Sequence, residues 1–106
     1  MKTVSEQMEL ARKAQAIVND YTQEQIDEIC LAIGWEVYED ENIAKLAKMA
    51  VEETGYGNVQ SKIIKHKRKA GGVLHDIKGA KSVGLIERNE ETGISKYAKP
   101  VGVVCA

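Results

Sequence analysis

Apolar residues recur every three to four positions in four successive segments of this chain, each of which is otherwise charged or polar. This spacing places the apolar residues of a segment on one face of a helix, so the pattern predicts four helices within residues 3–79. The four apolar faces consist of Val4, Met8, Ala11, Ala14 and Val18; of Ile26, Ile29, Cys30, Ile33 and Val37; of Ile43, Leu46, Ala47, Ala50 and Val51; and of Val59, Ile63, Ala70, Val73, Leu74 and Ile77.

Residues with capping chemistry mark the ends of these segments. Thr22 is followed three positions later by Gln25, which predicts a capping box at the start of the second helix. Gly55 follows the third segment as a glycine C-cap, and Asn58 precedes the fourth as an N-cap. The pair Gly71-Gly72 is a candidate kink in the fourth helix, because each glycine there costs about 1 kcal/mol relative to alanine.

The helical period ends near Gly79, and strand patterns follow. A short β-prone run, a polar turn and a second run predict a β-hairpin over residues 82–98. Residues 101–106 are an unbroken apolar run, which is typical of a strand buried on both faces of a parallel sheet. Such a strand needs neighbours and covering helices, so the chain is expected to be the N-terminal part of a larger α/β protein.

Composition narrows the class of protein. The 106 residues suit one small domain or a piece of a larger one, and the near balance of 15 basic and 16 acidic residues argues against a wholly basic nucleic-acid binder. No stretch approaches the roughly 18 apolar residues of a membrane span. The N-terminus lacks the apolar region of a signal peptide, and two distant cysteines do not form a disulfide framework, so a cytoplasmic protein is expected.

The balanced total hides an asymmetry. Residues 1–57 contain 5 basic and 12 acidic residues, whereas residues 58–106 contain 10 basic and 4 acidic residues. No linker or repeat separates the two parts. The division is therefore interpreted as two faces of one fold rather than two domains.

Cysteines and histidines offer little chemistry. Cys30 lies on the apolar face of the second predicted helix and is expected to be a buried structural residue. Cys105 has no basic neighbour that would lower the pKa of a nucleophilic thiol. His66 and His75 are nine positions apart, which places them on opposite faces of a continuous helix, and a third metal ligand is lacking. No catalytic or metal-binding residue is predicted.

The basic run Lys62–Lys69 is the most distinctive local feature. The run is interpreted as a solvated helix face. The alternative is a helix that contacts the phosphates of nucleic acid or of an anionic cofactor, but no aromatic residue is interleaved for base stacking. Gly55-Tyr56-Gly57 is no dinucleotide fingerprint, because it follows a helix and Gln60 occupies the place of the third glycine. Trp35 and Tyr38 are expected to be packing residues.

Three segments resemble the N-terminal region of CoA-acylating aldehyde dehydrogenases. They are residues 50–65 (AVEETGYGNVQSKIIK), 81–86 (KSVGLI) and 98–104 (AKPVGVV), and the resemblance spans the chain from Val4. Residues 74–78 (LHDIK) are most similar to the succinate-semialdehyde and sulfoacetaldehyde members.

The resemblance implies an oxidoreductase that converts a small aldehyde into an acyl-CoA with NAD or NADP and coenzyme A. In that family a cysteine thiolate attacks the aldehyde, and its motif matches neither Cys30 nor Cys105. The resemblance further implies that residues 101–106 form the first strand of a Rossmann-type nucleotide-binding domain, incomplete in this chain. Residues 82–98 would belong to an oligomerisation sheet and support a homo-oligomer.

The sequence thus predicts a cytoplasmic enzyme segment that holds no catalytic, cofactor-binding or metal-binding residue and is inactive alone. Nucleic acid and membrane are not expected partners of such a segment. The alternative is a small helical binding module that uses Lys62–Lys69 on an anionic partner such as nucleic acid.

Overall fold

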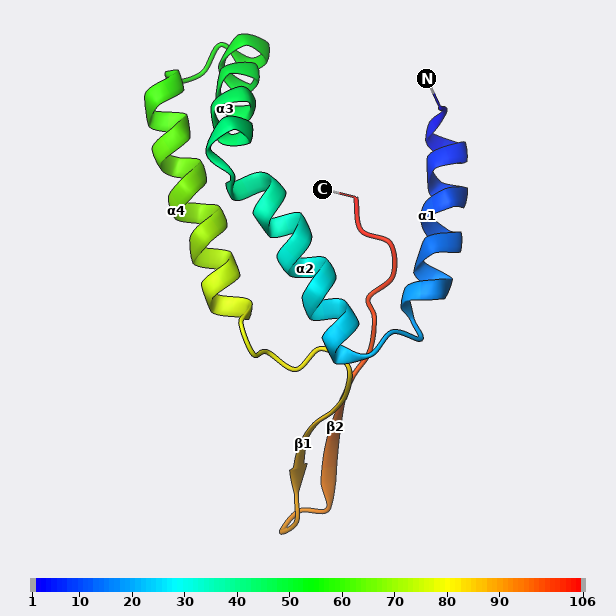
Figure 1. Cartoon of the computed structure of the whole chain (residues 1–106). Coiled ribbons are helices and arrows are strands. Elements are labelled where there is room, and N and C mark those ends of the chain that lie inside the picture. Colours follow the sequence, from blue (N-terminus) through cyan, green and yellow to red (C-terminus); the bar gives the residue numbers. More distant parts are fainter. Residues whose placement is uncertain (1, 106) are drawn as a thin grey trace. The chain divides into compact units, whose positions relative to one another are not determined.

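A computed structural model describes residues 2–105, which form four helices followed by a two-stranded hairpin (Figure 1). The helices are α1 (Val4–Val18), α2 (Gln23–Tyr38), α3 (Asp40–Thr54) and α4 (Val59–Ile77), and the strands are β1 (Gly84–Asn89) and β2 (Ile94–Ala98). The predicted helices and hairpin are therefore confirmed. The chain divides into two units. One consists of the residues up to 27 together with those from 81. The other consists of residues 28–80, and we call it the helical unit.

The predicted helix ends are also confirmed. The Thr22 hydroxyl accepts a hydrogen bond from the Gln25 N–H at 3.3 Å, while the Gln25 side chain accepts one from the Thr22 N–H at 2.9 Å. The Asn58 side chain accepts from the Ser61 N–H at 2.9 Å. Gly55 ends α3 with φ 67°, a left-handed conformation that a side chain would disfavour.

A second capping box begins α1. The Thr3 hydroxyl accepts a hydrogen bond from the Glu6 N–H at 3.3 Å, and the Glu6 carboxylate accepts one from the Thr3 N–H at 2.7 Å. The Thr3 N–H and, at 3.0 Å, the Thr3 hydroxyl both donate to the Glu6 carboxylate, and these two bonds, the backbone bond foremost, lower the pKa of Glu6. The spacing Thr-x-x-Glu carries the same signal as Thr22 and Gln25, although apolar periodicity alone does not reveal it.

The helical unit has a small core between α3 and α4, which pack against each other. Ile43 is completely buried and Ala47 is 2% exposed. Gly34 of α2 is buried as well, and a Cβ atom at this position would clash with the Leu74 side chain of α4. The absence of a side chain at Gly34 therefore lets α2 approach α4 closely.

The glycine pair in α4 does not interrupt the helix, which continues to Ile77. A Cβ atom at Gly71 would lie 3.0 Å from the Tyr38 ring, whereas one at Gly72 would have nothing within 4 Å. The helix is therefore continuous through both glycines, although each costs about 1 kcal/mol relative to alanine in a helix interior.

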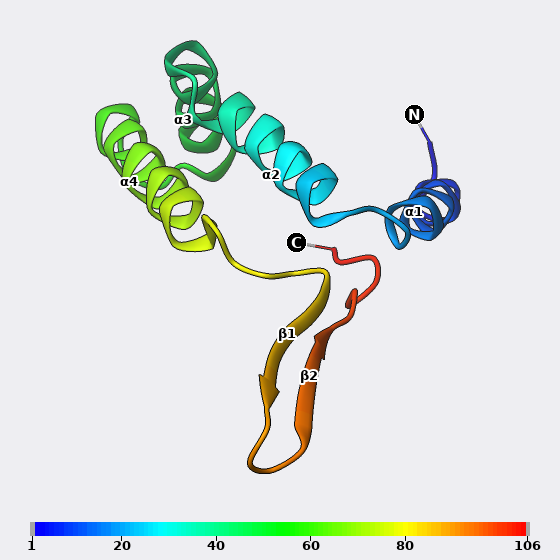
Figure 2. The ribbon, with the colours of Figure 1, turned by 60° about the horizontal axis from the view of Figure 1, so that its bottom comes forward.

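The hairpin pairs β1 and β2 in antiparallel register, with the connecting turn at its far end (Figure 2). Leu85 lies opposite Tyr97 and Glu87 opposite Lys96, so Ile86 is the extra residue of a β-bulge. The Lys96 ammonium and the Glu87 carboxylate form a cross-strand ion pair at 2.7 Å. Every β1 residue is exposed, so the two-stranded sheet has no covered face on this strand.

Three expectations from the sequence differ from the structure. Residues 101–105 form no strand, and residue 106 lies outside the described part of the chain. Since β1 and β2 pair only with each other, the apolar run has no strand beside it. Cys30 is exposed rather than buried, and Trp35 is 60% exposed rather than packed. The two residues lie on different faces of α2, and α3 and α4 leave both of them exposed.

No helix among residues 2–105 is both long and apolar enough to cross a membrane.

Candidate functional site

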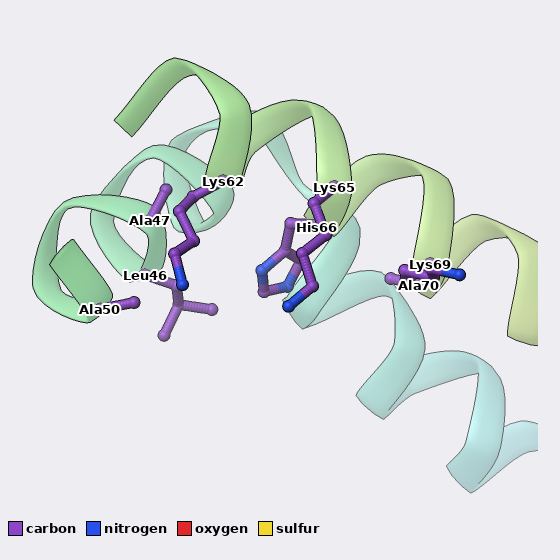
Figure 3. Close-up of a pocket in the computed structure, with 8 residues that line it drawn as sticks. All are labelled: Leu46, Ala47, Ala50, Lys62, Lys65, His66, Lys69 and Ala70. Carbon is purple, nitrogen blue, oxygen red and sulfur yellow. The ribbon is translucent and has the colours of Figure 1, made fainter. Parts of the chain in front are cut away.

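A pocket of about 260 Å³ lies between α3 and α4 in the helical unit (Figure 3). It is the candidate site of this chain, because it collects most of the basic run. The lining residues are Leu46, Ala47 and Ala50 of α3 and Lys62, Lys65, His66, Lys69 and Ala70 of α4.

The basic residues of the pocket follow a helical repeat. Lys62, Lys65, His66 and Lys69 occupy positions i, i+3, i+4 and i+7, which places them on one face of α4. We call these four residues the cationic stripe. In Figure 3 the side chains of Lys62, Lys65 and His66 extend from α4 toward the same side. The stripe therefore borders α3, while Lys65 and Lys69 remain exposed as expected of a solvated helix face.

The electrostatics of the stripe are one-sided. No acidic residue lines the pocket, and Lys62 and His66 are half-buried. Like charges four positions apart on a helix, as at Lys65 and Lys69, destabilise it by about 0.2–0.5 kcal/mol. The arrangement is thus slightly unfavourable for α4 by itself.

Lys67, in the middle of the same run, has a different environment. Its ammonium forms an ion pair with the carboxylate of Asp40, at the start of α3. The hydrogen bond from Lys67 to Asp40, together with the charge of Asp40, raises the pKa of Lys67 above its ordinary value of 10.5. The basic run therefore divides into a residue neutralised by an acidic helix end and a stripe that faces the pocket.

A second pocket, of about 690 Å³, lies in the other unit beside the base of the hairpin. Its lining is mixed, with apolar residues such as Val18, Ile26 and Tyr97 next to the polar Asn19 and Ser82. Its lining contains no Asp, Glu, His or Cys side chain, and its only lysine is Lys99. The chemistry of this lining suits packing contacts better than catalysis.

Gln23 joins α2 to the beginning of the hairpin with one side chain. Its carbonyl oxygen accepts hydrogen bonds from the N–H groups of Ser82 at 2.8 Å and Val83 at 3.0 Å. Its amide nitrogen donates to the Ser82 hydroxyl at 2.9 Å and to the Asp27 carboxylate at 2.8 Å. Both ends of the amide are satisfied, so Gln23 fixes a chain segment 59 positions away. No sequence motif identified this contact.

The cysteines and histidines are dispersed. Cys30 and Cys105 are free and exposed. His66 lines the candidate site, whereas His75 does not. Among residues 2–105, no group of three or more His, Cys, Asp or Glu side chains is placed to hold a metal ion.

Neither the glycine turn at residues 55–57 nor the basic pocket fits a dinucleotide cofactor. Gly55-Tyr56-Gly57 connects α3 to α4, so these glycines follow a helix and not the strand that a phosphate-binding turn requires. At about 260 Å³ the basic pocket is also smaller than the roughly 300–1,000 Å³ of pockets that hold drug-sized ligands.

No protein-family model matches the sequence. Among curated proteins, the acylating sulfoacetaldehyde dehydrogenase of Bilophila wadsworthia is 99% identical over 106 residues, which are 100% of this chain and 23% of that relative. A sulfoacetaldehyde dehydrogenase of Acholeplasma is 62% identical over 91% of this chain and 20% of its own length. The acetylating succinate-semialdehyde dehydrogenase of Clostridium kluyveri is 39% identical over 98% of this chain and 22% of its own.

Solved structures agree with these relatives. An acetylating aldehyde dehydrogenase from Geobacillus thermoglucosidasius matches with a TM-score of 0.76 and 42% identity, over 83% of this chain and 19% of the other. A probable aldehyde dehydrogenase from Listeria monocytogenes matches with a TM-score of 0.78 and 38% identity, over 87% and 20%. The chain thus spans about a fifth to a quarter of the length of these proteins. The resemblance seen in the sequence is confirmed: this chain is homologous to the N-terminal portion of CoA-acylating aldehyde dehydrogenases.

Proposed function

We propose that this chain is the N-terminal segment of an oxidoreductase that converts an aldehyde into an acyl-CoA with NAD or NADP and coenzyme A. The observation that carries the proposal is the 99% identity, over all 106 residues, to an acylating sulfoacetaldehyde dehydrogenase. Because the chain spans 23% of that relative, the reaction belongs to the longer polypeptide. We assign no step of it to residues 2–105.

The poor burial of apolar side chains supports a segment of a larger enzyme. Leu31 is 66% exposed, Trp35 60% and Val101 89%, whereas only Ile43 and Ala47 are buried hydrophobic residues within residues 2–105. Large apolar side chains gain about 1.5–3 kcal/mol each on full burial. These residues therefore offer contact surface for further protein.

The proposed substrate is sulfoacetaldehyde. Three relatives carry this aldehyde in their names, including one from Cupriavidus necator that is 41% identical over 91% of this chain. The substrate contacts themselves are expected outside this segment, as the sequence resemblance implied.

The experiment is an assay of the polypeptide that the complete gene encodes. We expect NAD(P)⁺ reduction that requires coenzyme A, with a higher kcat/KM for sulfoacetaldehyde than for acetaldehyde or succinate semialdehyde. The 106-residue chain alone, assayed in parallel, should show no turnover. Aldehyde oxidation without any need for coenzyme A would contradict the acylating reaction, and turnover by the short chain would contradict the absence of catalytic residues.

The two remaining structural proposals concern residues 82–98 and 101–106. We propose that the hairpin pairs between subunits of a homo-oligomer and that residues 101–106 become the first strand of a Rossmann-type domain in the longer polypeptide. The exposed strands of the hairpin and the exposed apolar run support this, because unpaired strand edges are prone to pair with another chain.

Sedimentation of the full-length protein tests the hairpin. The double substitution Leu85→Lys with Tyr97→Lys places two charges on an opposed, exposed pair and should shift the protein toward monomers. Val4→Lys, at a 77% exposed position of α1, is the control and should leave assembly unchanged. An unchanged oligomer in the double variant would contradict the proposal.

The nucleic-acid-binding alternative has no support, since the relatives are named as dehydrogenases. A cytoplasmic location stays a prediction.

A further inference from the structure

We propose that the pocket between α3 and α4 binds a small phosphate anion, held by the cationic stripe Lys62, Lys65, His66 and Lys69. This goes beyond the proposed dehydrogenase function, which uses none of these residues. Three features support the site: the placement of the stripe, its lack of acidic partners and the size of the pocket.

Three residues of the stripe, Lys62, Lys65 and His66, extend toward a space that α3 leaves open (Figure 3). All four stripe residues share one face of α4, and the α3 side of the pocket consists of Leu46, Ala47 and Ala50, none of which is charged. The two alanines are small, so room remains beside the basic side chains (Figure 3). Ammonium groups on flexible stems and an imidazole N–H are donors that phosphate oxygens accept well.

The positive charge of the stripe is not neutralised within residues 2–105. Among the ion pairs of this part of the chain, the basic partners are Lys48, Lys67, Arg88 and Lys96. Asp40, an acidic residue near α4, pairs with Lys67 and not with the stripe. A bound anion would remove the repulsion between like charges at i, i+3 and i+4.

The size of the pocket selects the class of anion. A volume of about 260 Å³ is below that of pockets for drug-sized molecules, but it is ample for a phosphate or pyrophosphate group. Nucleic acid is a poor candidate, because no aromatic residue lines the pocket for base stacking. The shared chemistry is a phosphate group, either free or at the end of a nucleotide.

The test is calorimetric titration of the 106-residue chain with inorganic pyrophosphate at low ionic strength. We expect binding at one site, and the triple substitution of Lys62, Lys65 and Lys69 by glutamine should weaken it at least tenfold. The matched control replaces Lys45, Arg68 and Lys78 by glutamine, which removes the same charge from residues that do not line the pocket. That variant should lose less than threefold.

A second variant separates the contribution of the open space in the pocket from that of the positive charge. Ala50→Leu keeps every basic residue but fills the space beside them, so it should also weaken pyrophosphate binding at least tenfold while helical circular dichroism is retained. Parallel titration with adenosine diphosphate distinguishes a free phosphate anion from the phosphate end of a nucleotide. Equal affinities point to a free phosphate anion, and at least tenfold tighter binding of the nucleotide points to a nucleotide; either supports the site if the variant pattern holds.

Three results would overturn the proposal. They are an absence of binding at millimolar pyrophosphate, an equal loss in the triple variant and its charge-matched control, and unchanged binding by a folded Ala50→Leu variant. None of these measurements uses dehydrogenase activity, so the outcome is independent of the proposed reaction.

Discussion

The helical unit and the hairpin are stabilised in different ways. In the helical unit α3 and α4 bury Ile43 and Ala47, and α2 approaches α4 where Gly34 lacks a side chain. The hairpin buries no residue and relies on its backbone ladder, one cross-strand ion pair and the contacts of Gln23. An isolated two-stranded hairpin is at best marginally stable in water. Packing therefore stabilises one region, whereas the other depends on its ladder and on its attachment through Gln23.

The largest expected effect is at the centre of the helical unit. Ile43→Ala removes a completely buried side chain and should lower the free energy of unfolding by about 2–5 kcal/mol. Urea titration followed by far-ultraviolet circular dichroism measures this loss. Ile33→Ala is the matched control, because Ile33 is 62% exposed and its truncation should change the free energy by less than about 0.5 kcal/mol. Equal losses would mean that the helical unit has no specific core.

The next effect concerns the approach of α2 to α4. Gly34→Ala places a Cβ atom against Leu74 and should destabilise the helical unit by about 1–3 kcal/mol. Gly72→Ala makes the same chemical change where nothing lies within 4 Å, and should stabilise α4 by up to about 1 kcal/mol. Thermal unfolding of both variants should show a lower melting temperature for Gly34→Ala and a higher one for Gly72→Ala. A stabilised Gly34→Ala variant would show that α2 and α4 do not need this close contact.

A smaller, local effect is expected in the other region. Gln23→Ala deprives the Ser82 and Val83 N–H groups of their acceptor, at a cost of about 1 kcal/mol for partly exposed hydrogen bonds. Amide hydrogen exchange should quicken at Ser82 and Val83 but not in α3. Gln60→Ala, in the first turn of α4, is the control and should leave both amides unchanged. Unchanged exchange in the Gln23 variant would show that the hairpin is held without it.

The smallest effect is a pH dependence in the helical unit. Because Asp40 raises the pKa of Lys67 above 10.5, the pair stabilises the fold at pH values below 10.5 and loses this contribution as pH rises through the raised pKa. The melting temperatures of the native chain and of Lys67→Gln should therefore differ at pH 8 and converge above that pKa. A difference that persists at high pH would attribute the effect to packing of the lysine stem.

Local sequence signals predicted much of this structure. The capping residues Thr22, Asn58 and Gly55 lie where the sequence placed them, because their hydrogen bonds involve atoms only three or four residues away. The same locality explains the hairpin. Burial was predicted less well, because Cys30 and Trp35 lie on parts of α2 that the rest of the helical unit leaves exposed.

The sequence predicted only part of the candidate site. The basic run was evident in the sequence, but the different environments of its lysines were not. Lys67 forms an ion pair with Asp40 of α3, whereas Lys69 lines the pocket between α3 and α4. Gln23 shows the same limit, since its partners lie 59 and 60 positions away.

The sequence by itself determined the positions of the four helices and of the hairpin, the helix ends and the kinship with acylating aldehyde dehydrogenases. These properties depend on short-range hydrogen bonds, on periodicity and on the identity of individual residues. Only the tertiary structure shows that α4 packs closely against α2 at Gly34 and that Gln23 forms hydrogen bonds with the start of the hairpin. It also shows that four basic residues line one pocket. Each of these depends on which surfaces of distant segments meet, and that is set by packing rather than by local preference.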